Sequence, residues 1–468
     1  MITNKGVDLR DSAAWRGLSL FQWTTTGLLL VVVVWPFPID RSAMVGCLIT
    51  TTQCAFIVVS VWRIAAILIT LEPTALPKPP LSYPRYTVMA ALHDEAEVVG
   101  QLIERLSRID YPRDRLEAFL LLEAHDLETI AAARAIDRPR WMKIIVVPPG
   151  NPGTKPRALN HGLSLATGDL VTIYDAEDDP DSMQLREAAG RFAADGTGRI
   201  ACFQAPLRIR RLGRPSRPTR FFDRQFAVEY AALFEVILPA MAQLGLPFPL
   251  GGTSNHFRAD ALRAVGGWDA WNVTEDADLG FRLWRNGWRQ GVLTLPTHET
   301  PPGGLDQWLP QRTRWLKGYM QTWGVHTRNP IKLGATGTLS LVLTLGTSLA
   351  SAAIHAVTLA WVLTSVLVAV VAGLSPQPPH LAVAVLLLGA AAAWLQGKIG
   401  ANRAAVPYTA ADMICSIAYW SLLTLAFCHA AWRLAREPFT WDKTRHFRDG
   451  DAVAIPMSVA VHAGRQAA

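Results

Sequence analysis

The sequence has 468 residues and a formal net charge of +7, and 50% of its residues are hydrophobic while 18% are charged. It is too apolar for an ordinary soluble enzyme and too charged for a protein buried wholly in lipid. Basic residues flank the apolar runs, so membrane orientation explains the positive charge, and nucleic acid is not expected as a partner.

Two apolar runs near the N-terminus, residues 18–35 and 43–71, supply the roughly 20 residues that a helix needs to cross a bilayer. A short Pro-Phe-Pro-Ile-Asp-Arg turn between them predicts a transmembrane hairpin over residues 18–71. Both ends of such a hairpin lie on one side of the membrane. The basic residues before it place residues 1–17 in the cytoplasm.

A proline-rich linker, residues 72–86, precedes a segment with a different pattern, residues 87–300. Short β-branched runs alternate there with amphipathic stretches, which predicts a mostly parallel sheet with helices on both faces. Ligands of such sheets gather at the carboxyl ends of the strands. The expected strands are 87–92, 118–122, 143–147, 170–174 and 200–205, and the expected helices are 95–109, 129–136, 155–166 and 181–194.

The chain becomes apolar again after an amphipathic interface segment at residues 301–336. Residues 337–432 have room for three to four transmembrane helices, the first two as a tight pair turning near residues 351–355. A total of about six spans puts the basic tail, residues 433–468, on the cytoplasmic side with the central domain.

The first chemical motif is an acidic run that follows the expected strand 170–174. Asp175 and Glu177 emerge at the strand end, where hard cations such as Mg²⁺ or Mn²⁺ bind carboxylates together with substrate phosphates. Such a metal stabilises the charge that grows on a departing nucleotide. A solvated acidic turn is an equally weighted alternative on this pattern alone.

The second motif, Thr-Glu-Asp-Ala-Asp, places Asp276 at the start of an expected helix over residues 276–286. An acid at this position often serves only as a cap or a partner of the helix dipole. The functional interpretation makes Asp276 the general base that removes a proton from an attacking sugar hydroxyl. Glu275 and Asp278 are expected to support it.

The third motif, Gln-x-x-Arg-Trp, lies in the amphipathic segment just before the membrane region. Its functional interpretation places Trp315 under a sugar ring, with Gln311 and Arg314 facing the acceptor and the diphosphate. The alternative is a basic interfacial helix with a tryptophan at the headgroup level.

Two more segments fit a nucleoside diphosphate. Lys155 begins an expected helix, where cations and backbone amides suit anionic oxygens. Glu123 and Asp126 end the second expected strand, where a carboxylate can contact a base or ribose. Either segment could instead be ordinary surface.

These segments, in this order, resemble glycosyltransferase family 2, specifically its membrane-embedded processive branch, which includes bacterial cellulose and hyaluronan synthases. The resemblance covers residues 86–323 and the flanking spans. It implies a GT-A fold, a Rossmann-like α/β domain with a mostly parallel sheet, placed in the cytoplasm between N- and C-terminal transmembrane helices.

The resemblance also implies roles for individual residues. Asp175 and Glu177 match the metal-binding motif, and Asp276 matches the catalytic base. Two departures are visible, a single Asp126 after His125 and a glutamate as the second acid of the metal motif. The donor side then comprises Glu123, Asp126, Lys155 and Asp175, and the acceptor side comprises Gln204, Gly252, Thr253, Gln311, Arg314 and Trp315.

The function implied by the resemblance is inverting, processive polymerisation of a nucleotide sugar, with UDP-glucose favoured, into a β-linked, glucan-like extracellular polysaccharide. The enzyme would lie in the inner membrane and use Mg²⁺ or Mn²⁺. The growing chain would leave through the spans, with accessory export subunits as candidate partners. Two alternatives stay open: transfer of a single sugar to a lipid-linked acceptor, and a non-catalytic export protein.

Overall fold

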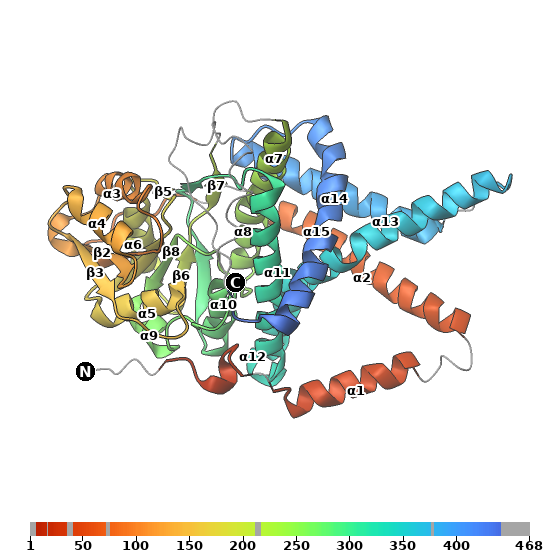
Figure 1. Ribbon diagram of the computed structural model, residues 1–468, viewed down its shortest axis with the longest axis horizontal. Helices are drawn as coiled ribbons and strands as arrows, with labels where there is room; N and C mark the ends of the chain where they lie inside the picture. The colour runs from red at the N-terminus through yellow and green to blue at the C-terminus, as the bar shows by residue number, and fades with distance from the viewer. Residues whose placement is uncertain are drawn as a thin grey trace, which may run out of the picture.

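The computed structural model describes residues 6–15, 17–34, 41–71, 75–210, 217–375 and 379–440. Figure 1 shows an α/β domain on one side of the molecule and a group of long helices on the other, with α7, α8 and α11 between them. The basic residues expected after residue 440 lie outside the described residues.

The domain is built on a seven-stranded sheet with the order β3-β2-β1-β4-β8-β6-β9. Strand β8 runs antiparallel to both of its neighbours, and the other pairs are parallel. The mostly parallel GT-A-like sheet expected from the sequence is therefore confirmed. The strands are β1 (Tyr86–Leu92), β2 (Leu116–Glu123), β3 (Met142–Val147), β4 (Leu170–Tyr174), β6 (Ile200–Gln204), β8 (Asn255–Arg258) and β9 (Arg289–Val292).

A second sheet of three short strands lies beyond the end of β4, in the order β5-β10-β7. Its strand β10 pairs antiparallel with β5 and parallel with β7. The pairing brings the chain before residue 300 next to the acidic run after β4. The strands are β5 (Asp179–Pro180), β7 (Leu207–Ile209) and β10 (Thr297–Glu299).

Helices cover both faces of the large sheet because alternate side chains of each strand point to opposite faces. On β1, Met89 joins a core with α5 and α10, whereas Val88 joins a core with α3, α4 and α6. Gly162 of α5 allows a close approach, since a Cβ there would lie 2.8 Å from the side chains of Leu121 and Met89. The helices are α3 (Val99–Ser107), α4 (Leu127–Ala135), α5 (Lys155–Leu165), α6 (Gln184–Ala194), α9 (Ala259–Ala264) and α10 (Glu275–Arg285), with 3₁₀ turns at η1 (Leu9–Asp11) and η2 (Arg113–Arg115).

Among the described residues, five helical stretches are long and apolar enough to cross a membrane by length and composition. One of them, Arg220–Gln243, has no counterpart in the sequence predictions and is largely buried between the domain and the other helices. Helix α1 has 15 residues. The helices are α1 (Leu20–Val34), α2 (Arg41–Ile69), α7 (Arg217–Ala232), the π-helix η3 (Leu233–Ile237), α8 (Leu238–Gln243), α11 (Leu305–Thr327), α12 (Pro330–Leu341), the π-helix η4 (Val342–Gly346), α13 (Thr347–Val371), α14 (His380–Arg403) and α15 (Ala410–Arg436).

The turn predicted near residues 351–355 is wrong. Helix α13 passes through this segment without a break, and α12, η4 and α13 follow one another directly. The segment Ser-Ala-Ala-Ile-His holds no glycine or proline, and its alanines favour a helix. The non-helical residue of this path is Gly334, whose φ of 71° few other residues adopt.

The helix group divides into two parts. Helix α14 packs mainly on α2 and α7, whereas α13 packs mainly on α15, which also contacts α11. Figure 1 shows α2 and α13 diverging as they leave the α/β domain.

Candidate active site

One cavity of about 780 Å³ joins the strand ends of the α/β domain to the interior of the helix group. We call the part lined by the domain the catalytic limb, and its wall includes His93, Glu123, Lys155, Asp175, Glu177, Gly252, Thr253, Glu275, Asp276 and Glu299. We call the part lined by α2, α7, α13, α14 and α15 the membrane limb, and its wall includes Phe56, Arg63, Glu229, Ser351, His355, Gly389 and Trp420. Helix α11 lies between the two limbs and contributes Gln311, Arg314 and Trp315.

The acidic run after β4 faces the catalytic limb. Asp175 forms an ion pair with Lys155, whose Nζ also donates to the carbonyl of Gly252 at 2.8 Å. A Cβ on Gly252 would lie 3.4 Å from Oδ2 of Asp276. The metal-motif acid and the expected base, 101 positions apart in the chain (276 − 175), therefore both lie close to Lys155 and Gly252.

Carboxylates are crowded at this point of the wall. Burial, followed by the charge of Asp175, raises the pKa of Glu177 to about 8. Burial, followed by the charge of Asp178, also raises the pKa of Glu299. Such shifts arise where several acids share too few cations. The sequence analysis missed Glu299, because its place beside the acids is set by the pairing of β10 with β5.

The donor set fits a hard divalent cation. Asp178 is fully buried, and its Oδ2 accepts hydrogen bonds from the backbone N–H of Asp175 and from the hydroxyl of Thr253. Its Oδ1 has no hydrogen-bond partner among the described residues. Carboxylate oxygens in excess of nearby cations are the ligands that Mg²⁺ and Mn²⁺ prefer. A metal at Asp175 and Glu177 is thus compatible with the charge of the wall.

Asp276 lies in the first turn of α10, but it is not the helix cap. The N-cap residue is Thr274, and Oδ1 of Asp276 accepts from the N–H of Ala277 at 2.8 Å. Burial raises the pKa of Asp276, and Lys155 and Arg314 act against this rise. A buried carboxylate with a raised pKa suits proton abstraction.

The two acids beside Asp276 differ from each other. Burial, followed by the charge of Asp276, raises the pKa of Glu275 to about 7, and its residue lines the cavity. Asp278 points away from the cavity wall and binds Arg282 and His326 at 3.0 Å each. Asp278 therefore acts as a structural support of α10, and Glu275 belongs to the site.

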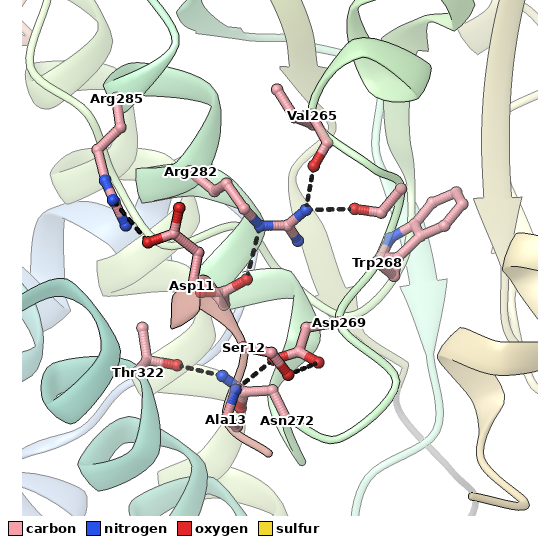
Figure 2. A network of polar contacts seen from close by, with 12 residues as sticks. Asp11, Ser12, Ala13, Val265, Trp268, Asp269, Asn272, Arg282, Arg285 and Thr322 are labelled. Atoms are coloured by element: carbon pink, nitrogen blue, oxygen red, sulfur yellow. Dashed lines mark hydrogen bonds and ion pairs between the residues drawn. The ribbon is translucent and has the colours of Figure 1, made fainter. Parts of the chain in front are cut away.

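The N-terminal segment contacts α10 and the loop that precedes it, as Figure 2 shows. Asp269, in the loop before α10, accepts hydrogen bonds from the Ser12 hydroxyl at 2.8 Å and from the Ala13 N–H at 2.7 Å. Asp11 forms an ion pair with Arg285 at 2.8 Å. These contacts fix residues 11–13 to the α/β domain, on the same side of the helix group as the site.

Helix α11 brings all three residues of its motif to the cavity. Between them in sequence, Arg312 binds both carboxylate oxygens of Glu229 at 2.7 Å and lies 4.5 Å from the Trp315 ring. This pair positions the indole, since the planar guanidinium stacks on it. The sequence analysis did not single out Arg312 or Glu229, whose pairing across α7 and α11 leaves no local signal.

Two predicted site residues do not line the cavity. Asp126 caps α4 by accepting from the Thr129 N–H at 3.1 Å, and it also accepts from the Asp94 N–H at 2.6 Å. Asp126 thus has a capping role, and the nucleotide contact predicted for it stays a prediction. Gln204 is buried and binds the N–H of Gly251 and the carbonyl of Thr253, so it shapes the loop at residues 251–253.

Two further polar groups lie near the ends of strands β1 and β2. Glu123 lines the wall but is bound to Arg157 at 2.5 Å. His93, Asp94 and Asp126 bring possible ligand atoms within 4.8 Å of one another. Both oxygens of Asp126 already accept backbone hydrogen bonds, so this group is a weaker cation site than the run after β4.

The GT-A-like sheet, the strand-end acids and the apolar helices define a membrane-associated glycosyltransferase of the GT-A class. The family described as Glycosyl transferase family group 2 matches residues 170–396, and Glycosyl transferase family 2 matches residues 87–249. The chain belongs to glycosyltransferase family 2 and is related to cellulose synthase catalytic subunits.

The curated relatives include two kinds of enzyme. A β-monoglucosyldiacylglycerol synthase from Synechocystis is 28% identical over 253 residues, covering 52% of this chain and 50% of the relative. A cellulose synthase 1 catalytic subunit from Komagataeibacter xylinus is 26% identical over 260 residues, covering 54% of this chain and 33% of the relative. The chain thus spans half or less of the length of these relatives.

A solved structure has the same fold. The mannosyltransferase PcManGT from Pyrobaculum calidifontis, in complex with GDP-Man and Mn²⁺, is similar with a TM-score of 0.51 and 18% identity. The match covers 82% of this chain and 98% of that one.

Proposed function

We propose that the protein is an inverting hexosyltransferase that moves a sugar from a nucleotide donor to an acceptor hydroxyl at the membrane surface. The observation that carries this proposal is that Asp175 and Asp276 line one cavity close to Lys155. Lys155 binds the diphosphate, and Asp175 and Glu177 would hold the divalent metal. The metal, when bound, neutralises charge on the leaving diphosphate.

The remaining steps belong to the chain's own groups. Asp276 accepts the proton of the acceptor hydroxyl, whose oxygen forms a bond to the anomeric carbon. The bond from that carbon to the diphosphate breaks, and the nucleoside diphosphate leaves with the electron pair. Attack opposite to the leaving group inverts the anomeric carbon, so an α-linked donor gives a β-linked product. Orientation and charge neutralisation supply most of the acceleration.

We propose UDP-glucose as the sugar donor. The resemblance to cellulose synthase favours UDP-glucose, whereas the solved mannosyltransferase holds GDP-Man. Residues 6–15 pack on the α/β domain, and α2 returns to it, so both ends of the N-terminal hairpin lie on one side. We propose that this side is the cytoplasmic side of the inner membrane, because basic residues precede the hairpin.

The acceptor has two candidates. One is a growing β-linked glucan that leaves between the spans, with accessory export subunits. The other is a lipid, and a specific observation favours it. The membrane limb lies between the two parts of the helix group, and many of its side chains are small or apolar, among them Phe56, Val59, Leu386, Gly389 and Ala393. A lipid chain fits such a wall better than a hydrated sugar polymer does.

The test uses the full-length protein reconstituted in lipid and supplied with labelled UDP-glucose, UDP-N-acetylglucosamine or GDP-mannose. Release of the nucleoside diphosphate reports transfer, and gel and lipid analysis separate a polymer from a glycolipid. Metal-dependent release with one donor is expected for the wild type. Equal release by wild type and Asp276→Asn would refute the proposal.

A further inference from the structure

The membrane limb contains a cation that its protein surroundings do not neutralise. Arg63 lies in α2, inside the apolar stretch Val45–Ile69, and lines the cavity. Among the residues that the structure describes, Arg63 forms no hydrogen bond and no ion pair, and only the more distant charge of Glu229 acts on it. Ionisable residues in membrane segments are costly, and they mark functional sites.

Glu229 does not balance the charge of Arg63. Both of its carboxylate oxygens bind Arg312 at 2.7 Å, and one of them also accepts from the Tyr419 hydroxyl at 2.7 Å. In the described part of the membrane limb, the two cations Arg63 and Arg312 therefore face the single anion Glu229. This wall carries one excess positive charge, which an anionic ligand would neutralise.

The depth of Arg63 fits a lipid headgroup. It lies six positions before Ile69, the last residue of α2, which corresponds to about 9 Å along the helix at about 1.5 Å per residue. The end of α2 lies next to the α/β domain, because Ala66 and Ile67 share a small core with Val236 and Ala240, and α8 contacts strand β9. Arg63 thus lies just below the membrane face on which the site opens.

Further from the domain, the limb offers room for chains and one more polar atom. Helices α13 and α14 line it with Ser351, Thr358, Leu386 and Gly389. His355 contacts Trp420 with ring centres 5.7 Å apart, and its buried Nε2 has no hydrogen-bond partner among the described residues. The wall of the membrane limb is therefore mainly apolar, and a few polar side chains interrupt it.

We propose that Arg63 binds the phosphate of a lipid whose chains occupy the membrane limb and whose headgroup extends past Trp315 toward Asp276. The proposal rests on the proposed function and deepens it, since it names the acceptor class as a phosphate-bearing lipid. The phosphate matches the excess charge, and arginine binds phosphate oxygens in a bidentate manner.

The experiment measures lipid binding to the full-length protein in a non-ionic detergent by native mass spectrometry. The probes are phosphatidylglycerol, whose headgroup carries hydroxyls beyond its phosphate, undecaprenyl phosphate and diacylglycerol. They separate a glycerolipid phosphate, an isoprenoid phosphate and a lipid with no phosphate. Arg63→Gln is expected to weaken binding of one or both phosphate lipids about 10- to 100-fold, as loss of a charged hydrogen bond does. Binding of diacylglycerol should not change.

Two further variants control for folding and for charge. Arg433→Gln removes an arginine of α15 that pairs with the exposed Glu437, outside the cavity, and should bind all three lipids like the wild type. Arg63→Lys keeps the charge and should retain part of the phosphate-lipid binding. Unchanged binding of both phosphate lipids by Arg63→Gln would overturn the inference, as would an equal loss of UDP binding or full competition by inorganic phosphate.

Failure of this inference can be told apart from failure of the proposed function. Arg63-dependent lipid binding without sugar transfer to any acceptor would refute the proposed function and leave the lipid site. Sugar transfer that is equal in wild type and Arg63→Gln, with no preference for a phosphate lipid, would refute the lipid site and leave the transferase.

Discussion

In the catalytic limb of the cavity, carboxylates outnumber the cations Lys155 and Arg314 on the same wall. In the membrane limb, Arg63 and Arg312 face one carboxylate, that of Glu229. The acids that crowd the first limb are Asp175, Glu177, Glu275, Asp276 and Glu299.

This difference in wall charge indicates which kind of ligand each limb would bind. A wall rich in acids gains most from a divalent cation. A wall with an excess arginine gains most from an anion. One cavity thus has complementary charge for a metal–diphosphate at one end and for a phosphate-bearing lipid at the other. Each prediction below changes a charge and asks whether the limbs respond as this comparison requires.

The largest expected effect is that of Asp276→Asn. The amide cannot accept the hydroxyl proton, so turnover should fall about 10²- to 10⁴-fold. Binding of the nucleotide should stay within a small factor, because Lys155 and Asp175 are intact. Release of labelled nucleoside diphosphate and equilibrium binding of UDP measure the two quantities. A parallel loss of both would assign Asp276 to donor binding.

A smaller effect is expected from Glu177→Gln. Removal of one charged ligand should raise the Mg²⁺ or Mn²⁺ concentration for half-maximal turnover by about tenfold or more, since a charged contact contributes about 1.5–3 kcal/mol. EDTA should stop turnover by the wild type, and added metal should restore it. Full turnover of the wild type in EDTA would contradict a metal role for the acidic limb.

The acidic limb should also impose a pH dependence on stability. The pKa of Glu275 is raised from 4.5 to about 7, so between these values the folded protein keeps a proton that the unfolded chain has released. Stability from this group is complete below about pH 4.5 and falls as the pH rises toward about 7. Glu275→Gln should flatten this slope of melting temperature against pH.

The exposed residue Glu128 provides a matched control, because Glu128→Gln removes a carboxylate outside the cavity. It should leave the slope unchanged. If the slope is the same in wild type and Glu275→Gln, the pKa of Glu275 is not raised in the folded protein.

The smallest effect is expected outside both limbs. Asp11→Asn breaks the ion pair with Arg285. The side chain of Asp11 is about one-third exposed. Such pairs contribute about 0–1 kcal/mol, so the melting temperature should fall slightly and turnover should stay unchanged. A large loss of turnover would mean that the N-terminal segment controls the position of α10.

Local patterns in the sequence determined much of the fold. The strand predicted at residues 170–174 is β4 to the residue, and the helix predicted from Lys155 begins there. Apolar runs and turn residues act over a few neighbours, so they can be read without the rest of the chain. The same reading failed at residues 351–355, where a few polar side chains suggested a turn inside the continuous helix α13.

The sequence by itself determined the α/β domain between apolar helices, and it pointed to Asp175, Asp276 and Trp315. Only the tertiary structure decided that Asp126 caps a helix, that Glu299 joins the acids, and that Arg63 faces an unbalanced cavity. Charge balance depends on groups far apart in the chain, so it exists only once the helices and the sheet have packed together.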